Sequence, residues 1–372
     1  MPVMDIERPH GLPRRFEGGD PMAGVPRPPA PRPRGCAAEH RHYPARWEPL
    51  SGPDLLDRLR VTGRRRPRAR ADLVQVLRSG LESGLGAVGE GGIGGQPGVP
   101  PGAPHPAPLV VTKDRLTRVL ACEAHAVATP FGQRSNSVAL ACGAIVDALF
   151  RQLVTVGSIG DPMADGLAAL AVDGRQSDLV GWVERLSGTE RDELGAEVER
   201  QAEGLRRRWP ALDPSWLPRT QEAMRVRLAD GALELSARVD LAIGRPAGDV
   251  ASVAIVEVKS GARRAEHRAD LHFSALLETL RSPAPPFVVA TYYTRTGELD
   301  VDPVTDELLM ASARRTLTGA RRLADLAGGA EPGRTAHPLC GRCSVLPEGD
   351  VGPGPSDGTG PGARRDGAGE GR

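Results

Sequence analysis

Two apolar segments, Leu233–Ile243 (LELSARVDLAI) and Val253–Lys259 (VAIVEVK), decide the fold of this chain. The first alternates apolar and polar residues with period two, which predicts a strand whose Asp240 lies on the face opposite the apolar set. The second is apolar almost throughout, as in a central strand buried on both faces. Glu257 and Lys259 stand two residues apart at its end, so both side chains leave from the same face. A loop of about nine residues joins the strands, and we therefore expect Asp240 to lie beside Glu257.

The elements around these two strands predict an α/β fold with a mixed central β-sheet flanked by helices. Helices come first along the chain, then a β-β-β-α-β succession, then a last helix, an order that favours a sheet with helical layers. The expected helices start at Thr112, cover 138–153, start at Thr189, and cover 266–281 and 304–327, and the expected strands cover 224–228, 233–243, 253–259 and 287–294.

Composition divides the chain into four parts. Its 46 Gly and 35 Pro make up about 22% of 372 residues, well above the usual share of about 12%. The excess gathers in a Pro/Arg-rich arm (1–52) and in a tail (344–372), both expected to be disordered. Residues 53–108 are expected to form a weakly helical segment followed by a Gly/Pro linker. The folded domain is then predicted to cover 109–343.

The overall composition argues against several classes of protein. Aromatic residues are only 3% of the chain, which argues against nucleic-acid binding by rows of stacked rings. Five cysteines scattered over 372 residues do not form a secreted disulfide framework. No apolar run approaches the roughly 18 residues of a membrane span. We therefore expect a cytoplasmic protein with no membrane partner.

Lysine is almost absent from this chain. Of its 48 basic residues, only Lys113 and Lys259 are lysines. The arginine guanidinium is planar and its charge is delocalised, whereas the lysine ammonium group is compact and its pKa shifts readily. The two lysines are either survivors of a compositional bias or residues whose task arginine does not fulfil, and the sequence leaves both readings open.

Two carboxylates that face each other repel, and either a raised pKa or a divalent cation relieves the repulsion. Asp240, Glu257, a backbone carbonyl and several waters would suit Mg²⁺, which substrate phosphate often completes. Lys259 could then orient a water or stabilise charge on phosphorus. The alternative is a buried Glu257–Lys259 ion pair with Asp240 as a turn residue. The residue pattern alone leaves both open.

Asp240, followed by the run 257–261 (EVKSG), resembles the D…E-x-K core of the PD-(D/E)XK nuclease superfamily, and the RecB-like exonuclease branch in particular. The likeness covers residues 112–343 and is strongest over 222–299. It implies a restriction-endonuclease-like core with an N-terminal helical part, and Mg²⁺- or Mn²⁺-dependent hydrolysis of DNA phosphodiesters, with a role in DNA repair or recombination and a repair or helicase partner. Exonuclease and endonuclease action both stay open.

The resemblance also implies roles for single residues. Asp240, Glu257 and the backbone carbonyl of Val258 would hold the metal, and Lys259 would serve the attacking water. Glu222, just before the first strand, matches an acid often found there and is a further candidate ligand.

Two helices depart from the family pattern. Asp147 stands where the family has a histidine, four residues after Gly143, and is a candidate ligand in its place. Asp270 and Ser274 replace the Gln and Tyr of a family helix motif, which leaves Ser274 and His272 as the candidates for DNA contact. These departures favour an alternative function, a catalytically weakened nuclease-fold protein that binds DNA or a repair partner without cutting. A third alternative is an unrelated α/β protein in which the motif arises by chance.

Three cysteines match the family's iron–sulfur arrangement. Some RecB-like nucleases hold a [4Fe-4S] cluster with one N-terminal and three C-terminal cysteines, and Cys122, Cys340 and Cys343 fall at three of these places. The fourth cysteine is missing, while a cluster requires four ligands. His337 or Cys142 could complete an iron–sulfur or zinc site, and a site without metal is the other alternative.

Overall fold

The computed structural model describes the residues that form the folded body of the chain. The predicted tail (344–372), most of the Gly/Pro linker and all but the last residue of the predicted arm (1–52) lie outside the described residues. The described ranges are 52–60, 66–86, 107–128, 136–174 and 176–334.

Six strands form one mixed sheet, as the sequence predicted. β3 pairs in parallel with β1 and antiparallel with β2 and β4, β4 pairs in parallel with β5, and β6 closes the sheet antiparallel to β5. The order is β1-β3-β4-β5-β6, with β2 on the other edge of β3. The strands are β1 (Leu109–Thr112), β2 (Arg219–Leu228), β3 (Leu233–Ile243), β4 (Ala254–Lys259), β5 (Val288–Tyr293) and β6 (Glu298–Pro303).

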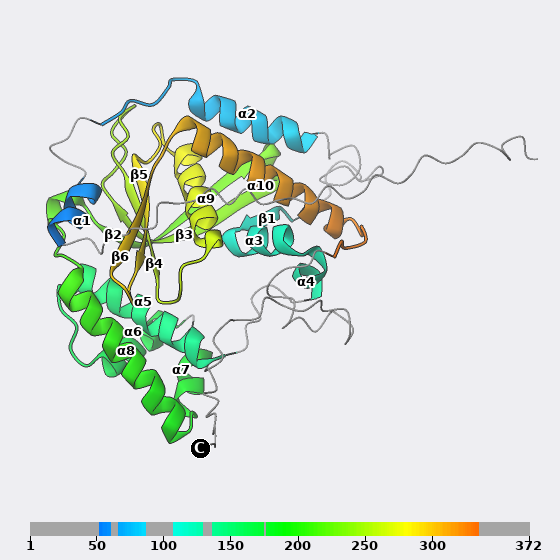
Figure 1. Cartoon of the computed structure of the whole chain (residues 1–372). Coiled ribbons are helices and arrows are strands. Elements are labelled where there is room, and N and C mark those ends of the chain that lie inside the picture. Colours follow the sequence, from blue (N-terminus) through cyan, green and yellow to red (C-terminus); the bar gives the residue numbers. More distant parts are fainter. Residues whose placement is uncertain (1–51, 61–65, 87–106, 129–135, 175, 335–372) are drawn as a thin grey trace, which may run out of the picture. The chain divides into compact units, whose positions relative to one another are not determined.

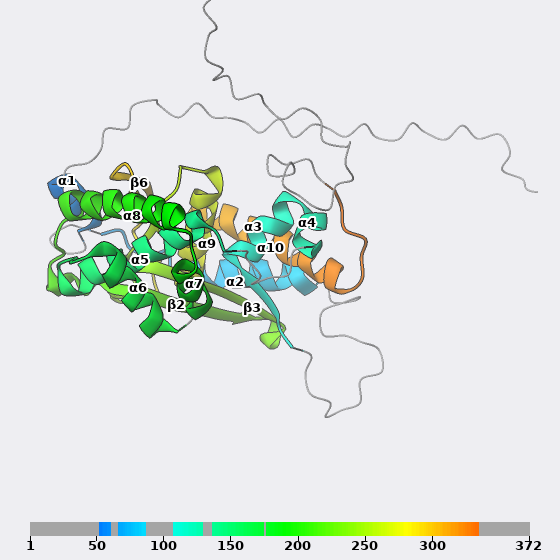
Figure 2. The same cartoon turned by 90° about the horizontal axis from the view of Figure 1, so that it is seen from below.

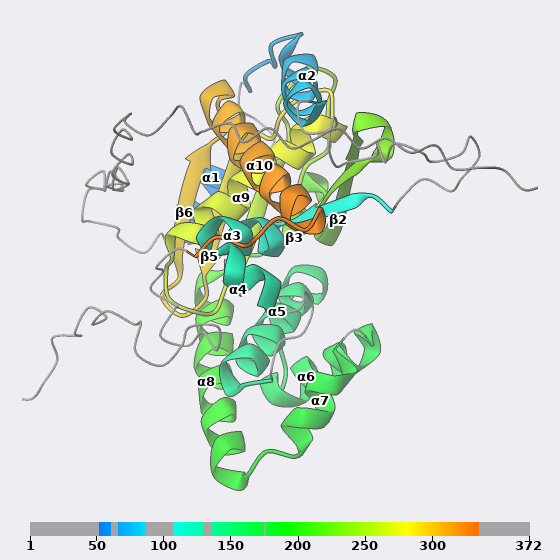
Figure 3. The ribbon, with the colours of Figure 1, turned by 90° about the vertical axis from the view of Figure 1, so that its right-hand side faces the viewer.

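Helices cover both faces of the sheet (Figure 1). The helices α5 to α8 pack together below one face, and α2, α3, α9 and α10 lie on the other, as the views in Figures 2 and 3 show. The helices are α1 (Gly52–Leu59), α2 (Leu73–Gly86), α3 (Lys113–Ala121), α4 (Glu123–Ala128), α5 (Val138–Val156), α6 (Pro162–Asp173), α7 (Ser177–Glu184), α8 (Gly188–Arg208), α9 (Ala265–Arg281) and α10 (Asp306–Ala327).

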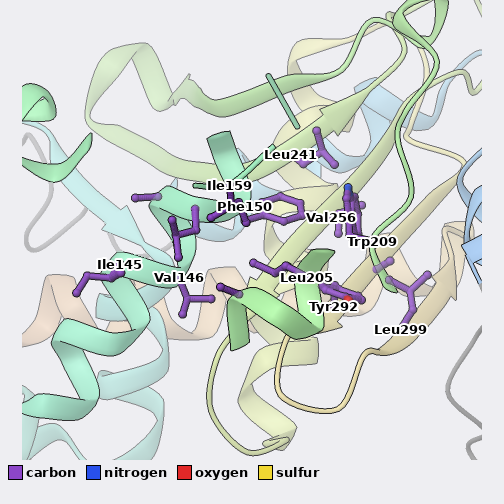
Figure 4. Close-up of a cluster of buried hydrophobic side chains, with 14 of the residues drawn as sticks. Ile145, Val146, Phe150, Ile159, Leu205, Trp209, Leu241, Val256, Tyr292 and Leu299 are labelled. Carbon is purple, nitrogen blue, oxygen red and sulfur yellow. The ribbon is translucent and has the colours of Figure 1, made fainter. Parts of the chain in front are cut away.

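The first core lies between the sheet and helices α5 and α8 and is built around three aromatic rings (Figure 4). Trp209 stands edge-on to Phe150, with ring centroids 4.7 Å apart, and edge-on to Tyr292, at 4.9 Å. Edge-to-face pairs of this kind stabilise a core beyond the area that they bury. They fix α5 and the end of α8 against β5, and α5 carries one of the candidate site residues.

The second core lies on the opposite face and includes residues from before position 109. The leucines of α2 recur every four residues and are buried against α9 and α10, and Leu55 and Leu59 of α1 are buried in the first core. A stripe of leucines with this spacing needs a partner surface. The described folded body therefore includes α1 and α2, the helical segment expected before residue 109, packed in the first and the second core respectively. The α2 leucines are Leu73, Leu77, Leu81 and Leu85.

Most predicted elements are present, but five of the described α-helices and strands are additional: β1, β6, α4, α6 and α7. The two strands were not predicted because β1 has only four residues and β6 (ELDVDP) is polar. Helix α8 begins one residue before the predicted Thr189. Its capping box joins Ser187 and Glu190 rather than Thr189 and Asp192, which satisfies the free N–H groups of the first turn.

Helix α5 is the exception to the expectation that no apolar run reaches the length of a membrane span. Its 19 residues have a mean hydropathy of 1.6, enough to cross a membrane by length and composition only. In the described part of the chain it packs as a core helix against α6, α8 and the sheet. About 39% of this stretch is buried inside the protein.

The functional residues lie at a split in the sheet, the gap along one edge of β3 between the end of β1 and the end of β4. β1 pairs with residues 233–236 of β3, and β4 pairs with residues 241–243 on the same edge, because β2 occupies the other edge at both places. β1 runs parallel to β3 and β4 runs antiparallel to it. The carboxyl ends of β1 and β4 therefore approach each other beside residues 237–240.

Candidate active site

Both lysines of the chain meet at this split and bind the same carboxylate. Lys113 follows β1 directly and begins α3, and its Nζ lies 2.6 Å from Oε1 of Glu257. Lys259, two residues further along β4, places its Nζ 3.3 Å from Oε2. Lys113 also donates to the carbonyl of Arg238 at 3.0 Å. Glu257, only 2% exposed, is thus neutralised by two ammonium groups that come from different strand ends.

A second group of acids gathers around Asp240. The β3–β4 pairing reaches Leu241↔Val256, directly before Asp240, and Oδ2 of Asp240 accepts a hydrogen bond from the backbone N–H of Val258 at 2.7 Å. The side-chain amide of Gln221 donates to Asp240 at 3.3 Å and to both oxygens of Asp147, on α5, at 3.2 and 3.3 Å. Two carboxylates from different elements therefore converge on one amide nitrogen.

The acids of the site have opposite pKa shifts. Burial, the charge of Glu257 and the charge of Asp147 raise the pKa of Asp240 to about 7, and burial also raises the pKa of Asp147. Burial alone would raise the pKa of Glu257, but the ammonium groups of Lys113 and Lys259 outweigh it and hold that pKa below its usual value. The site thus combines an ionised carboxylate, Glu257, with two carboxyl groups, Asp240 and Asp147, whose negative charge is disfavoured by burial. Such perturbed pKa values are common in functional sites.

The structure brings together five of the residues predicted from the sequence. Asp240, Glu257, Val258 and Lys259 lie at the split, and Asp147 reaches them from α5. For Val258, the backbone N–H is the group that contacts Asp240.

Three other candidates are engaged elsewhere. Glu222 pairs with Arg219 and with Arg281 at the end of α9. His272 lies 2.9 Å from a carboxylate oxygen of Asp302. Ser274 is fully buried, and its hydroxyl donates within α9 to the carbonyl of Asp270. Ser274 is thus not exposed at the surface, where the predicted DNA contact would require it. Its neighbours Phe273 and Ala275 lie in the second core.

Sequence reasoning missed two residues of the site, Lys113 and Gln221. The signal for Lys113 was present, because it is the other of the two lysines in the chain, but its distance of 144 residues from Glu257 gave no reason to join them. Gln221 gave no signal of its own. It stands beside Glu222, which was chosen instead, and a strand sends neighbouring side chains to opposite faces.

Two hollows border the site and share Lys259. The first, about 210 Å³, is lined by Asp147, Ser260 and His267 among others. The second, about 470 Å³, is lined by Lys113, Thr117, Arg225, Arg238 and Asp270 among others. Lys259, whose side chain is 27% exposed, therefore borders both hollows.

The cysteine arrangement is only partly described. Cys122 is buried at the end of α3. Next to it, Gly333 exchanges hydrogen bonds with the backbone N–H of Ala124 at 3.1 Å and the carboxylate of Glu123 at 2.8 Å. The chain beyond α10 thus returns to Cys122 seven residues before Cys340, although Cys340, Cys343 and His337 lie outside the described residues. Cys142 lies in the first core, where burial raises its thiol pKa to about 11, unfavourable for a metal ligand.

A hard, hydrated cation fits the acids around Asp240. Within the described residues, no group of three or more His, Cys, Asp or Glu side chains is arranged as a metal site. Mg²⁺, however, keeps most of its water and binds through one or two carboxylates. Asp147 and Asp240 supply two carboxylates that converge on one point. Glu257 is held by the two lysines, whereas Asp147 and Asp240 are the two carboxylates of the site that accept from the Gln221 amide.

The titration of Asp240 should lower the stability of the protein as the pH rises from about 4 to about 7. In this window the folded protein retains a proton on Asp240, whose pKa is about 7, which the unfolded chain, with a value of 3.8, has lost. The state that binds more protons loses stability as the pH rises. His267 contributes with the opposite sign up to its unfolded value of 6.5, because burial and the charge of Lys259 lower its pKa in the folded protein to about 4. Glu257 changes the stability of the protein only in more acidic solution, because its pKa in the folded protein is lowered.

Urea unfolding at pH 5, 6, 7 and 8 measures this dependence. Asp240→Asn should remove the contribution of Asp240, since the amide does not titrate and its oxygen can still accept from Val258. Asp147 keeps a smaller contribution of the same sign, and His267 keeps the opposite one. Parallel curves for the two proteins would contradict the assignment.

Comparison with models of protein families gave no match, and comparison with curated proteins gave none. The interpretation of this site therefore depends on its geometry and chemistry.

Proposed function

We propose that the chain is a metal-dependent DNA nuclease that hydrolyses phosphodiester bonds. One observation supports this most: Asp240 accepts a hydrogen bond at 2.7 Å from the backbone N–H of Val258, between Glu257 and Lys259, and Lys259 borders two hollows. This is the arrangement that the resemblance to RecB-like nucleases implies. The resemblance, rather than the geometry, supplies DNA as the substrate, a repair or helicase partner and a cytoplasmic location.

Each residue has a role in this proposal. Asp147 and Asp240 would hold Mg²⁺ or Mn²⁺, which when bound lowers the pKa of water and neutralises charge on phosphate. Lys259 would orient the water and stabilise negative charge that develops on phosphorus. Glu257 fixes the position of the Lys259 ammonium group, and Lys113 keeps Glu257 ionised.

A second candidate function is binding of DNA without cleavage. It is favoured by the two lysines on Glu257, because a carboxylate held by two ammonium groups at 2.6 and 3.3 Å is a poor third ligand for a cation. The two functions require the same fold and the same charged cleft, and they differ in whether phosphodiester bonds are broken.

The test is a cleavage assay on end-labelled single- and double-stranded DNA with Mg²⁺, Mn²⁺, Ca²⁺ or EDTA. The proposal predicts cleavage with Mg²⁺ or Mn²⁺ and none with EDTA. Asp240→Asn should reduce the rate at least about 100-fold, because a carboxylate ligand is lost. Glu222→Gln is the matched control, since Glu222 pairs with Arg219 and Arg281 instead.

The outcomes separate the candidates. DNA binding by the wild-type protein without cleavage under any metal condition would support the second function. Equal cleavage by wild type and Asp240→Asn would place the activity at another site.

A further inference from the structure

The side chain of Gln221 lies where the two carboxylates of the proposed metal site converge. Its Nε2 atom is within 3.2–3.3 Å of three oxygens, two on Asp147 and one on Asp240. Carboxylates only accept hydrogen bonds, so the nitrogen end of the amide must face them. The donor of Gln221 thereby takes the place that a cation would take between these acids.

The backbone at Gln221 is distorted to reach this position. Its φ angle is +54°, in the left-handed region that residues other than glycine rarely adopt. The pairs Thr220↔Leu241 and Glu222↔Val239 continue on either side, so the distortion is local and lies opposite Asp240.

The neighbours of Asp240 on the facing strand lie in different cores, Val239 in the second and Leu241 in the first. Strained residues persist where the surrounding structure holds them, and they gather at functional sites. The strained residue Gln221 thus stands at the position that shares a hydrogen bond with Asp240.

We propose that Gln221 is a positioning residue of the metal site: its amide nitrogen joins Asp147 and Asp240 when no ion is bound, and its amide oxygen turns toward the ion when one is. The inference rests on the proposed function, because it assumes a cation between these acids. An amide suits both states, since it carries a donor and an acceptor on one planar group. A glutamate at this position could bind the ion but could not donate a hydrogen bond to the two acids. An apolar side chain could do neither.

Two substitutions of similar size test this on the full chain, with Mn²⁺ as the probe. Gln221→Glu adds a third carboxylate, so Mn²⁺ should bind about tenfold more tightly, as charge count tunes such sites. Its ion-free melting temperature should fall, because three acids then repel one another. Gln221→Met removes both ends of the amide and should weaken Mn²⁺ binding about tenfold. Titration calorimetry and the melting temperature with and without Mn²⁺ measure these effects.

Glu222→Gln is the control, since Glu222 is adjacent in β2 but pairs with Arg281 on α9, and it should leave the Mn²⁺ affinity unchanged. Mn²⁺ affinities of Gln221→Met and Gln221→Glu equal to the wild-type value would overturn the inference while leaving DNA cleavage intact. If Gln221→Glu does not fold, Gln221→Met alone decides. The predicted affinity changes in a protein that cuts no DNA would support the inference and remove the nuclease proposal. A wild-type protein that binds no Mn²⁺ would overturn both.

Discussion

Replacing Lys259 with alanine is expected to reduce the rate of metal-dependent DNA cleavage about 10³-fold, within the range for loss of a group that moves protons or stabilises charge. The fold should persist, because Lys259 is 27% exposed and Glu257 keeps its 2.6 Å contact with Lys113. Cleavage of end-labelled DNA under single-turnover conditions, with circular dichroism as the check on folding, measures the effect.

Arginine at this position should not restore the activity. Lys259→Arg keeps the positive charge but replaces a compact ammonium group with a planar fork, and we expect a loss of about 100-fold. Arg264→Ala is the matched control, because Arg264 borders the same hollow as Lys259 and lies on the exposed side of it. It should affect DNA affinity at most. If Lys259→Ala cleaves DNA at the wild-type rate, the measured activity does not come from this site.

The paired strands could be predicted from the sequence because their patterns are strong. The alternation in LELSARVDLAI gave the bounds of β3, 233–243, and the apolar run before Glu257 gave β4 within one residue. The short loop between them predicted that Asp240 would lie beside the end of β4, and Asp240 accepts a hydrogen bond from the backbone N–H of Val258 there. Local periodicity and a short connection are sufficient for such a hairpin.

The rest of the site depends on contacts that no local pattern records. Lys113 meets Glu257 only because β1, a four-residue strand, pairs on the same edge of β3 as β4. The position of Gln221 depends on one unusual φ angle, which its residue type does not predict. Ser274 was expected at the surface but is buried, with its neighbours Phe273 and Ala275 in the second core. These positions follow from tertiary packing rather than from local periodicity.

Glu257→Gln is expected to destabilise the folded protein by about 3 kcal/mol, the lower end of the range for breaking a buried ion pair by removing one partner. The glutamine is the same size but uncharged, so the ammonium groups of Lys113 and Lys259 would face each other without the carboxylate between them. Both lysines are partly exposed, at 21% and 27%, and this keeps the cost at the lower end. Urea unfolding monitored by circular dichroism measures the change.

A double-mutant cycle separates the contribution of Lys113 from that of the carboxylate alone. Lys113→Met by itself should cost less, because Lys259 still pairs with Glu257 at 3.3 Å. In the double variant with Glu257→Gln, only one ammonium group remains and the repulsion between the two lysines is removed. The double variant should therefore be more stable than the sum of the two single changes predicts, by about 1–2 kcal/mol. Additive changes would mean that Lys113 and Glu257 do not interact in solution, and the lysine would then have no part in keeping Glu257 ionised.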